Sequence, residues 1–147
     1  MDSIHYLHER GIAHRDLKPD NVLISHPDHK ILVIDFNISK KGRQTEEGHR
    51  FKYRYLSHIA TPNSQAPELL KEGYYTESID IWGIGLIMYT LLTGYKLKRE
   101  KEVVEEQIDE IDNVSDACKA FLKSLLAESP DVRPSAAELK AKGDELW

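Results

Sequence analysis

A dense group of polar side chains comes directly before an apolar run at residues 12–24, "IAHRDLKPDNVLI". Within it, Asp16 stands two residues before Lys18 and five residues before Asn21. A carboxylate can accept a proton, a nearby ammonium can stabilise developing negative charge, and an amide oxygen can bind a hard cation. Because a solvated charge run does not usually end in a buried strand, we interpret this stretch as a site that carries chemistry.

The two apolar runs "NVLI" and "KILVIDF", separated by the turn sequence "SHPDH", predict a β-hairpin. If Asp28 stands at its tip, Asn21 faces Asp35 across the two strands. Directly opposed residues of antiparallel strands lie about 5 Å apart. The predicted hairpin therefore brings an amide oxygen and a carboxylate together beside Asp16 and Lys18, with room for one hard cation, most simply Mg²⁺.

The rest of the pattern predicts a mainly helical chain. Helices are expected at residues 2–10, 66–72, 78–93, 101–111, 115–127 and 135–142. The helix at 78–93 is apolar on all sides, which places it in the centre of the core. Ser115 is expected to cap the helix that follows it. Residues 37–65 are polar and irregular, and we expect them to form a long surface loop.

In the first predicted helix, Ile4, Leu7 and His8 fall on one face. This places His8 among apolar neighbours.

Composition limits the classes of function. The chain has 147 residues, of which 40% are hydrophobic and 31% charged, as expected of one globular domain. Its net charge of −5 gives no sign of nucleic-acid binding. The single cysteine, Cys118, cannot form an internal disulfide and is interpreted as a packing residue. The opening residues do not resemble a signal peptide, and the apolar stretch at 79–94, interrupted by Asp80, is too short to cross a membrane. We expect an intracellular, cytoplasmic protein with no membrane partner.

Five strings in the chain follow the order found in eukaryotic protein kinases. They are "HRDLKPDN" at 14–21, "DFN" at 35–37, "APE" at 66–68, "DIWGIG" at 80–85 and "RPSAAEL" at 133–139. By these strings the chain resembles the larger, C-terminal lobe of that fold over residues 1–147. The small N-terminal lobe is not expected, because no glycine-rich loop precedes the first string. The resemblance implies an α+β, mainly α-helical lobe with small β-hairpins at the catalytic end. It also implies a catalytic loop at 14–21 and an activation segment at 35–68.

By the same resemblance, Asp16 is the catalytic base that accepts the substrate hydroxyl proton, and Lys18 meets the transferring phosphate. Asn21 and Asp35 resemble the two Mg²⁺ ligands, and Leu23 resembles the apolar floor beneath adenine. The lysine within "DLKPDN" is the pattern of serine/threonine kinases. The implied activity is therefore phosphorylation of protein Ser/Thr hydroxyls, with ATP and Mg²⁺ as cofactors and a protein as substrate.

Regulatory residues are implied as well. Arg15 resembles the residue that pairs with a phosphorylated activation segment. Thr61 falls where family members keep a threonine that bonds the catalytic aspartate and lysine. The candidate phosphorylation sites are Thr45, Tyr53, Tyr55 and Ser57.

Supporting contacts are implied by the remaining strings. Glu68 and Arg133 resemble a buried ion pair between the end of the activation segment and the last helices. Asp80 resembles the anchor that accepts hydrogen bonds from the backbone of the catalytic loop. His14 is expected to be a packed, hydrogen-bonded core histidine, and Phe36 is expected to pack in the core.

The chain also departs from the family pattern. Asn37 replaces a glycine, and asparagine is the residue best able to follow glycine into positive φ. Ala60 and Ser64 replace a glycine and a tyrosine near the peptide-recognition end of the activation segment. Without a small lobe, apolar surface near Leu23 and Phe36 is expected to be exposed and open to association. Two classes of function stay open, an active Ser/Thr kinase and a non-catalytic, pseudokinase-like interaction module.

Overall fold

The computed structural model describes residues 1–44, 51–54, 65–70, 73–98 and 104–146 of the chain. In this part the fold is α+β and mainly helical, as the sequence predicts. The helices are α1 (Asp2–Glu9), α2 (Ser78–Thr93), α3 (Val104–Asp109), α4 (Asp116–Leu125) and α5 (Ala136–Leu146). The short strands are β1 (Ile12–Ala13), β2 (Val22–Ile24), β3 (Ile31–Val33), β4 (Lys40–Lys41), β5 (Arg43–Gln44), β6 (Phe51–Arg54) and β7 (Tyr74–Tyr75). No helix of the described segments is long and apolar enough to cross a membrane.

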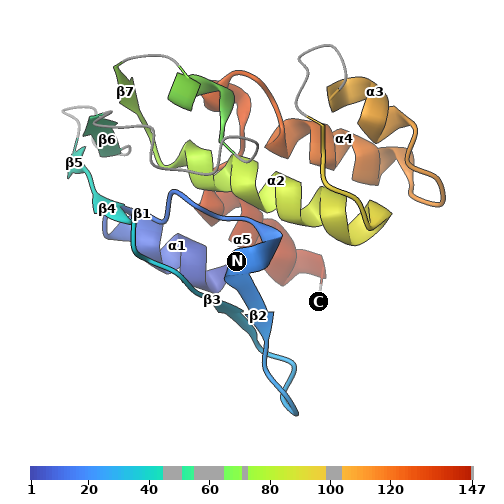
Figure 1. Cartoon of the computed structure of the whole chain (residues 1–147), viewed down its shortest axis with the longest axis horizontal. Helices are drawn as coiled ribbons and strands as arrows, with labels where there is room; N and C mark the ends of the chain where they lie inside the picture. The colour runs from blue at the N-terminus through green and yellow to red at the C-terminus, as the bar shows by residue number, and fades with distance from the viewer. Residues whose placement is uncertain (45–50, 55–64, 71–72, 99–103, 147) are drawn as a thin grey trace.

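Helix α2 forms the centre of the fold, as its uniformly apolar sequence predicts. Helices α1 and α5 lie side by side on one side of it, and α4 and α3 pack on the other (Figure 1). It ends at Gly94, which adopts a left-handed φ of 76° that favours glycine. The helices around α2 therefore form the scaffold on which the loops near its N-terminus are placed.

Local capping signals agree with the structure. The Ser115 side chain accepts a hydrogen bond from the Cys118 amide at 3.2 Å, so the predicted cap of α4 is confirmed. At α5, the Ser135 hydroxyl accepts a bond from the Glu138 amide, and the Glu138 carboxylate accepts one from the Ser135 amide at 2.7 Å. The helix predicted at 66–72 is instead a short 3₁₀ helix, Pro67–Leu70.

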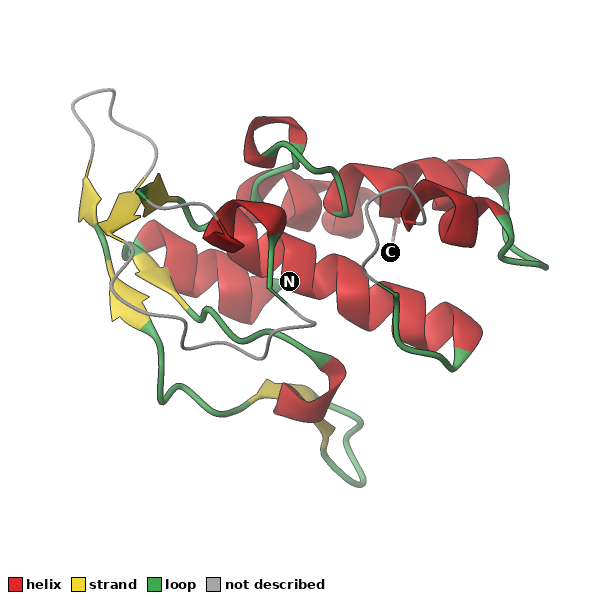
Figure 2. Ribbon diagram, turned by 45° about the horizontal axis from the view of Figure 1, so that its top comes forward, coloured by secondary structure: helices red, strands yellow, loops and turns green. Residues whose placement is uncertain are grey.

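The prediction of one long loop at 37–65 is wrong in part, because strands β4, β5 and β6 lie within this range. The strands gather along one side of the helical mass (Figure 2). Strand β4 pairs with β1, and β6 lies between β5 and β7. Tyr53 of β6 is 1% exposed, and its ring stacks on that of Tyr75 with 5.4 Å between centroids. This burial removes Tyr53 from the candidate phosphorylation sites.

The predicted hairpin is present as β2 and β3, but its predicted register is wrong by one residue. Val22 pairs with Val33 in the antiparallel ladder. The Ile34 amide donates to the Asn21 carbonyl at 3.0 Å, so Asn21 faces Ile34 and not Asp35. The register differs from the prediction because of the turn. The Ser25 amide donates to the Lys30 carbonyl, and this bond closes a turn of residues 26–29. The turn thus has an even number of residues and no single residue at its tip.

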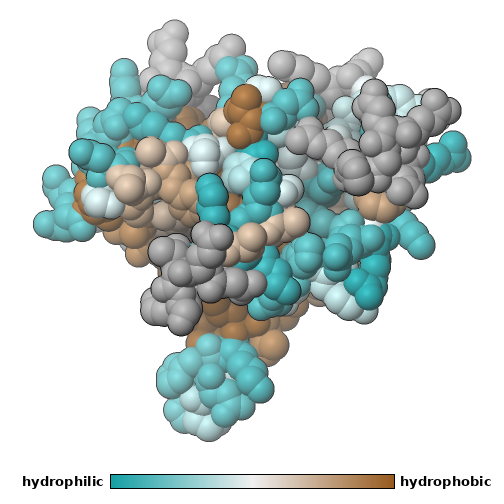
Figure 3. Space-filling view, turned by 180° about the vertical axis from the view of Figure 1, so that it is seen from behind, coloured by the Kyte–Doolittle hydropathy of each residue, from teal (hydrophilic) through white to brown (hydrophobic). Residues whose placement is uncertain are grey.

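Apolar side chains are exposed on both faces of this hairpin, because Leu23 pairs with Leu32 and the next pair, Ile24 with Ile31, points to the opposite side. Leu23, Ile24, Ile31 and Leu32 are 48%, 67%, 67% and 48% exposed. Figure 3 shows this hydrophobic surface next to the hydrophilic tip of the hairpin. Phe36 is 47% exposed, so the expectation that it packs in the core is wrong, whereas the expected exposure of apolar surface near Leu23 and Phe36 is confirmed. One edge of its ring contacts His14, and the rest is open to solvent because no described segment covers this face.

Candidate active site

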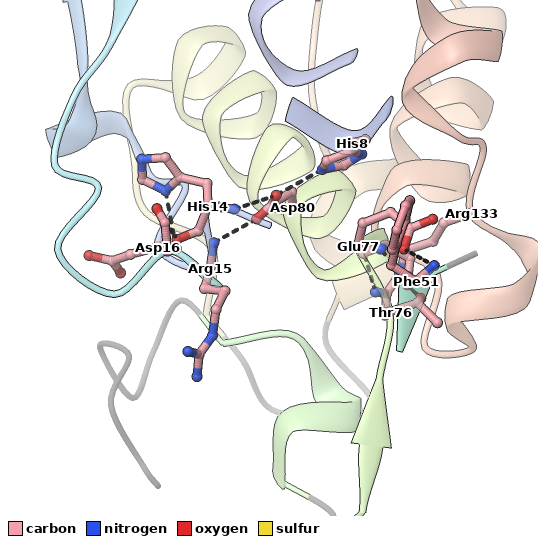
Figure 4. A network of polar contacts seen from close by, with 11 residues as sticks. His8, His14, Arg15, Asp16, Phe51, Thr76, Glu77, Asp80 and Arg133 are labelled. Atoms are coloured by element: carbon pink, nitrogen blue, oxygen red, sulfur yellow. Dashed lines mark hydrogen bonds and ion pairs between the residues drawn. The ribbon is translucent and has the colours of Figure 1, made fainter. Parts of the chain in front are cut away.

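The site is built on Asp80, a carboxylate near the start of α2 that is 1% exposed. Its Oδ2 accepts a hydrogen bond from the His14 amide and its Oδ1 accepts one from the Arg15 amide, both at 2.8 Å (Figure 4). His8 of α1 donates a third bond, from Nε2 to Oδ2, also at 2.8 Å. A buried carboxylate is tolerated when such donors surround it. Asp80 therefore holds the backbone that leads into Asp16.

The loop also rests directly on α2. A Cβ atom added at Gly83 would lie 2.5 Å from the Leu17 Cβ and 2.6 Å from the Leu17 carbonyl oxygen. Glycine is therefore required at this turn of the helix to let the loop backbone approach. Leu17 itself is 4% exposed and packs with Ile81 in the core. Residues on either side of Leu17 are thereby held at a fixed height above the helix.

The three polar residues singled out by their spacing come together on this loop. The Lys18 ammonium donates to Asp16 Oδ2 at 2.8 Å. The Asn21 amide nitrogen donates to the Asp16 carbonyl oxygen at 2.8 Å and to Asp16 Oδ2 at 3.1 Å. Asp16 Oδ1 is buried and has no hydrogen-bond partner among the described residues. A carboxylate can accept a proton, and the Asn21 Oδ1, which neither of these bonds uses, is the kind of oxygen that can serve as a cation ligand.

The start of the predicted activation segment is tied to this loop through His14, which is fully buried. His14 Nε2 bonds to the Ile34 carbonyl oxygen at 2.9 Å, and its ring meets the Phe36 ring edge-on at 4.8 Å. Asp35 lies between Ile34 and Phe36 in the chain and is exposed. Within the described residues no hydrogen bond joins Asp35 to Asp16 or Asn21. Asp35 is instead linked to the loop through its neighbour Ile34.

Backbone conformation marks two positions of the site. Arg15 and Asp35 adopt left-handed φ values of 75° and 62°. Such values are uncommon outside glycine and are found where the surrounding structure imposes them, often at functional sites. Asn37, which stands where the family pattern has a glycine, does not adopt a positive φ. Its amide donates to Asp35 Oδ1 at 3.3 Å instead.

Arg15 extends from the loop towards the strands. Its guanidinium donates to the Ile38 carbonyl oxygen at 3.1 Å and lies 5.5 Å from the centroid of the Tyr75 ring. Burial raises the pKa of Tyr75, and the positive charge of Arg15 offsets part of that rise. Thr61 and the candidate sites Thr45, Tyr55 and Ser57 lie outside the described residues. The structure therefore places Arg15 but not the phosphate partner expected for it.

A second polar contact joins the end of the predicted activation segment to the last helices. Arg133 donates to both carboxylate oxygens of Glu68, at 2.6 Å and 2.9 Å. Its side chain is fully buried, and that of Glu68 is 12% exposed. It also donates to the Ala127, Ser78 and Glu128 carbonyl oxygens. This bidentate pair brings together two residues 65 positions apart, as the resemblance implies.

Among the described residues, no group of three or more His, Cys, Asp or Glu side chains is arranged to hold a metal. The two residues expected to bind Mg²⁺, Asn21 and Asp35, are an amide and a single carboxylate. Both offer hard oxygen donors, and Mg²⁺ in proteins commonly takes only one or two such side chains together with phosphate oxygens and water. Leu23, expected beneath adenine, is 48% exposed and lies on strand β2, two residues after Asn21.

His8 is the member of the site that sequence reasoning missed. Its spacing from Ile4 and Leu7 placed it on the inward face of the first helix, but no role followed from that. The available signal was a polar side chain on the face of the helix that turns to the core. Such a side chain needs a buried partner, and the partner is 72 residues away on α2.

Comparison with known proteins identifies the class. The protein kinase domain model matches residues 1–143, and the chain therefore belongs to the protein kinase family. It is 34% identical to a probable myosin light chain kinase of Dictyostelium discoideum, over 98% of the chain and 42% of that protein. It is 35% identical to calcium/calmodulin-dependent protein kinase type 1B of Rattus norvegicus, over 90% of the chain and 40% of the relative. A serine/threonine-protein kinase H1 homolog of Danio rerio is 31% identical, over 94% of the chain and 35% of the relative. The chain thus spans about two fifths of the length of these relatives.

Proposed function

We propose that the chain carries the catalytic loop of a protein serine/threonine kinase, which transfers a phosphoryl group from ATP to Ser or Thr hydroxyls of a protein substrate. The observation that carries this proposal is the arrangement around Asp16. Lys18 and Asn21 both donate to its Oδ2, while its buried Oδ1 has no partner in the part of the chain that the structure describes. The names of the relatives support the same reaction class.

In this mechanism the Asp16 carboxylate orients the substrate hydroxyl and accepts its proton. Phosphoryl transfer asks little covalent chemistry of the protein, so positioning and charge stabilisation dominate. The Lys18 ammonium, held by Asp16 Oδ2, supplies positive charge where the phosphoryl oxygens develop negative charge. When bound, Mg²⁺ would be held by Asn21 Oδ1 and the Asp35 carboxylate and would neutralise phosphate charge. Leu23 would contact the adenine ring of ATP.

The same proposal assigns a catalytic loop at 14–21 and an activation segment at 35–68. Arg15 already lies at the start of that segment through its bond to the Ile38 carbonyl oxygen. A phosphate on Thr45, Tyr55 or Ser57 would supply the anion that a guanidinium binds in bidentate fashion. Thr61 would bond the catalytic aspartate and lysine.

A second candidate function, a non-catalytic interaction module, is favoured by one observation. A groove of about 780 Å³ lies between α1 and β3, and residues that line it include Tyr6, Leu32, Phe36 and Lys140. Ile31 and Leu32, two of the exposed apolar residues of the hairpin, also line this groove. Apolar surface of this kind often marks a protein interaction site. We propose that any association of the chain uses this face.

The two functions are separated by one transfer assay. Chain 1–147 is incubated with radiolabelled ATP, Mg²⁺ and a generic basic protein, beside Asp16→Asn and the hairpin-tip variant Asp28→Asn. The enzyme proposal predicts label transfer by the unaltered chain and by Asp28→Asn, because Asp28 is exposed in the hairpin turn and has no role in the proposed site. It predicts background transfer by Asp16→Asn. Transfer by the unaltered chain that is no greater than that of Asp16→Asn would remove the enzyme proposal for this chain and leave the interaction module.

A further inference from the structure

The turn of the β2–β3 hairpin carries two histidines three positions apart, within "SHPDHK" at 25–30. Both His26 and His29 are exposed, and their ring centroids lie 6.2 Å apart with an interplanar angle of 70°. Figure 1 shows the hairpin projecting away from the helices. Two imidazoles therefore lie side by side on an accessible part of the surface.

The backbone of this turn is fixed at its base. The Ser25 amide donates to the Lys30 carbonyl oxygen at 2.9 Å, and the Lys30 amide donates to the Ser25 hydroxyl oxygen at 3.1 Å. His29 adopts a left-handed φ of 51°, a conformation found in tight turns. Because the two bonds hold the residues that carry the rings close together, a ligand between the rings has little backbone left to order.

The separation of the rings suits one transition-metal ion. A Zn–N bond is about 2.0–2.1 Å long and a ring nitrogen lies about 1.1 Å from its centroid, so two imidazoles on one tetrahedral Zn²⁺ have centroids about 5 Å apart. The observed 6.2 Å exceeds this value by about 1 Å. Rotation about the side-chain torsions of two exposed residues can close that difference.

The ligand chemistry selects the class of ion. Neutral imidazole is a common ligand of Zn²⁺, Cu²⁺ and Ni²⁺, whereas Mg²⁺ prefers oxygen ligands. No group of three ligating side chains occurs among the described residues, so water would complete the coordination of an ion held by this pair. Asp28 adds negative charge to the turn, and the Lys30 ammonium, 3.9 Å from its Oδ2, offsets part of it.

We propose that His26 and His29 form a surface site for one divalent transition-metal ion, for which Zn²⁺ is the probe. The site shares no residue with the proposed Mg²⁺ ligands, Asn21 and Asp35, and it uses nitrogen in place of oxygen. It does not depend on the proposed kinase activity, so a failed transfer assay leaves it unchanged.

The test is a titration of chain 1–147 with zinc chloride, followed by NMR of the backbone amides and the imidazole nitrogens. His26→Asn and His29→Asn each remove one imidazole from the exposed turn and keep a polar side chain. His5→Asn is the matched control, because it removes an imidazole from α1, where His5 lies 3.5 Å from a Glu9 carboxylate oxygen. A parallel titration uses magnesium chloride.

The proposal predicts that Zn²⁺ shifts the signals of residues 25–30 and of both imidazoles, and that these shifts saturate at one ion per hairpin. Each hairpin variant should weaken this binding by about tenfold or more, because it removes one of the two protein ligands. His5→Asn should bind at the turn as the unaltered chain does, and Mg²⁺ should leave the turn signals in place.

Three results would overturn the proposal. They are the absence of Zn²⁺ shifts at the turn, shifts that persist at full affinity in both hairpin variants, and an equal response to Mg²⁺. If a variant does not fold, the imidazole nitrogen signals of the unaltered chain still decide the question, because both must move on Zn²⁺ binding.

Discussion

Replacing Glu68 with alanine tests the buried ion pair that joins the end of the predicted activation segment to the last helices. Glu68→Ala removes both carboxylate acceptors of the Arg133 guanidinium, at 2.6 Å and 2.9 Å. The arginine side chain is fully buried and cannot turn to solvent without disturbing the core. The variant therefore leaves a buried positive charge without its counter-charge.

The expected cost follows from this geometry. Breaking one partner of a buried pair costs about 3–5 kcal/mol. We expect a value near the lower end, about 3 kcal/mol, because Arg133 keeps its bonds to three carbonyl oxygens. A change of 1 kcal/mol shifts the melting temperature of a domain of this size by about 2–4 °C, so the expected drop is about 6–12 °C. The cost of about 3 kcal/mol is a large part of the 5–15 kcal/mol by which a typical domain is stable against unfolding.

Urea and thermal unfolding followed by circular dichroism measure the effect. The control is Lys123→Ala, which breaks a surface pair with Asp109 of similar length, 2.8 Å, but with 33% and 59% exposed side chains. That variant should lose less than about 1 kcal/mol. The double variant Glu68→Ala with Arg133→Met should lose less than the sum of its single changes, because the stranded charge is gone. A loss for Glu68→Ala no larger than that of the control would refute the reasoning.

The remaining predictions concern packing and ionisation. Gly83→Ala forces a methyl group against Leu17 and should cost about 1–3 kcal/mol in urea unfolding. Gly143→Ala, with open space at its Cβ in α5, should be neutral or stabilise by up to about 1 kcal/mol; equal losses in the two variants would contradict this packing. Burial raises the pKa of Tyr53 above its ordinary value of 10.0. Above about pH 10 the unfolded chain therefore releases a proton that the folded chain keeps, so stability should fall as pH rises. Tyr53→Phe should reduce the slope of urea midpoints against pH in this range, and an unchanged slope would show that Tyr53 does not cause it.

Local signals in the sequence predicted the helices well. The range of α2 follows from an uninterrupted apolar stretch, and the starts of α4 and α5 follow from Ser115 and Ser135, whose capping contacts involve only the next few residues. Strands β4 to β6 were missed for the opposite reason. They are two to four residues long and depend on partners that are distant in sequence, such as the pairing of Tyr53 with Tyr75.

The candidate site was predicted in part. The resemblance and the spacing within the loop placed Asp16 beside Asn21, and the structure brings them together. The hairpin was predicted, but its register depends on a turn length that the sequence did not settle, and an error of one residue put Asp35 opposite Asn21. His8 stayed without a role because its partner, Asp80, comes from a helix whose placement only the folded chain reveals.

The central claim is that Asn21 and Asp35 serve one cation site within reach of Asp16, even though they do not face each other across the hairpin. Mg²⁺ titration of the chain in the presence of ATP, followed by calorimetry, tests this claim most directly. The account predicts that Asp35→Ala and Asn21→Ala each weaken Mg²⁺ binding by about tenfold or more, while Asp28→Asn at the hairpin tip binds as the unaltered chain does. Unchanged Mg²⁺ affinity in Asp35→Ala would contradict it.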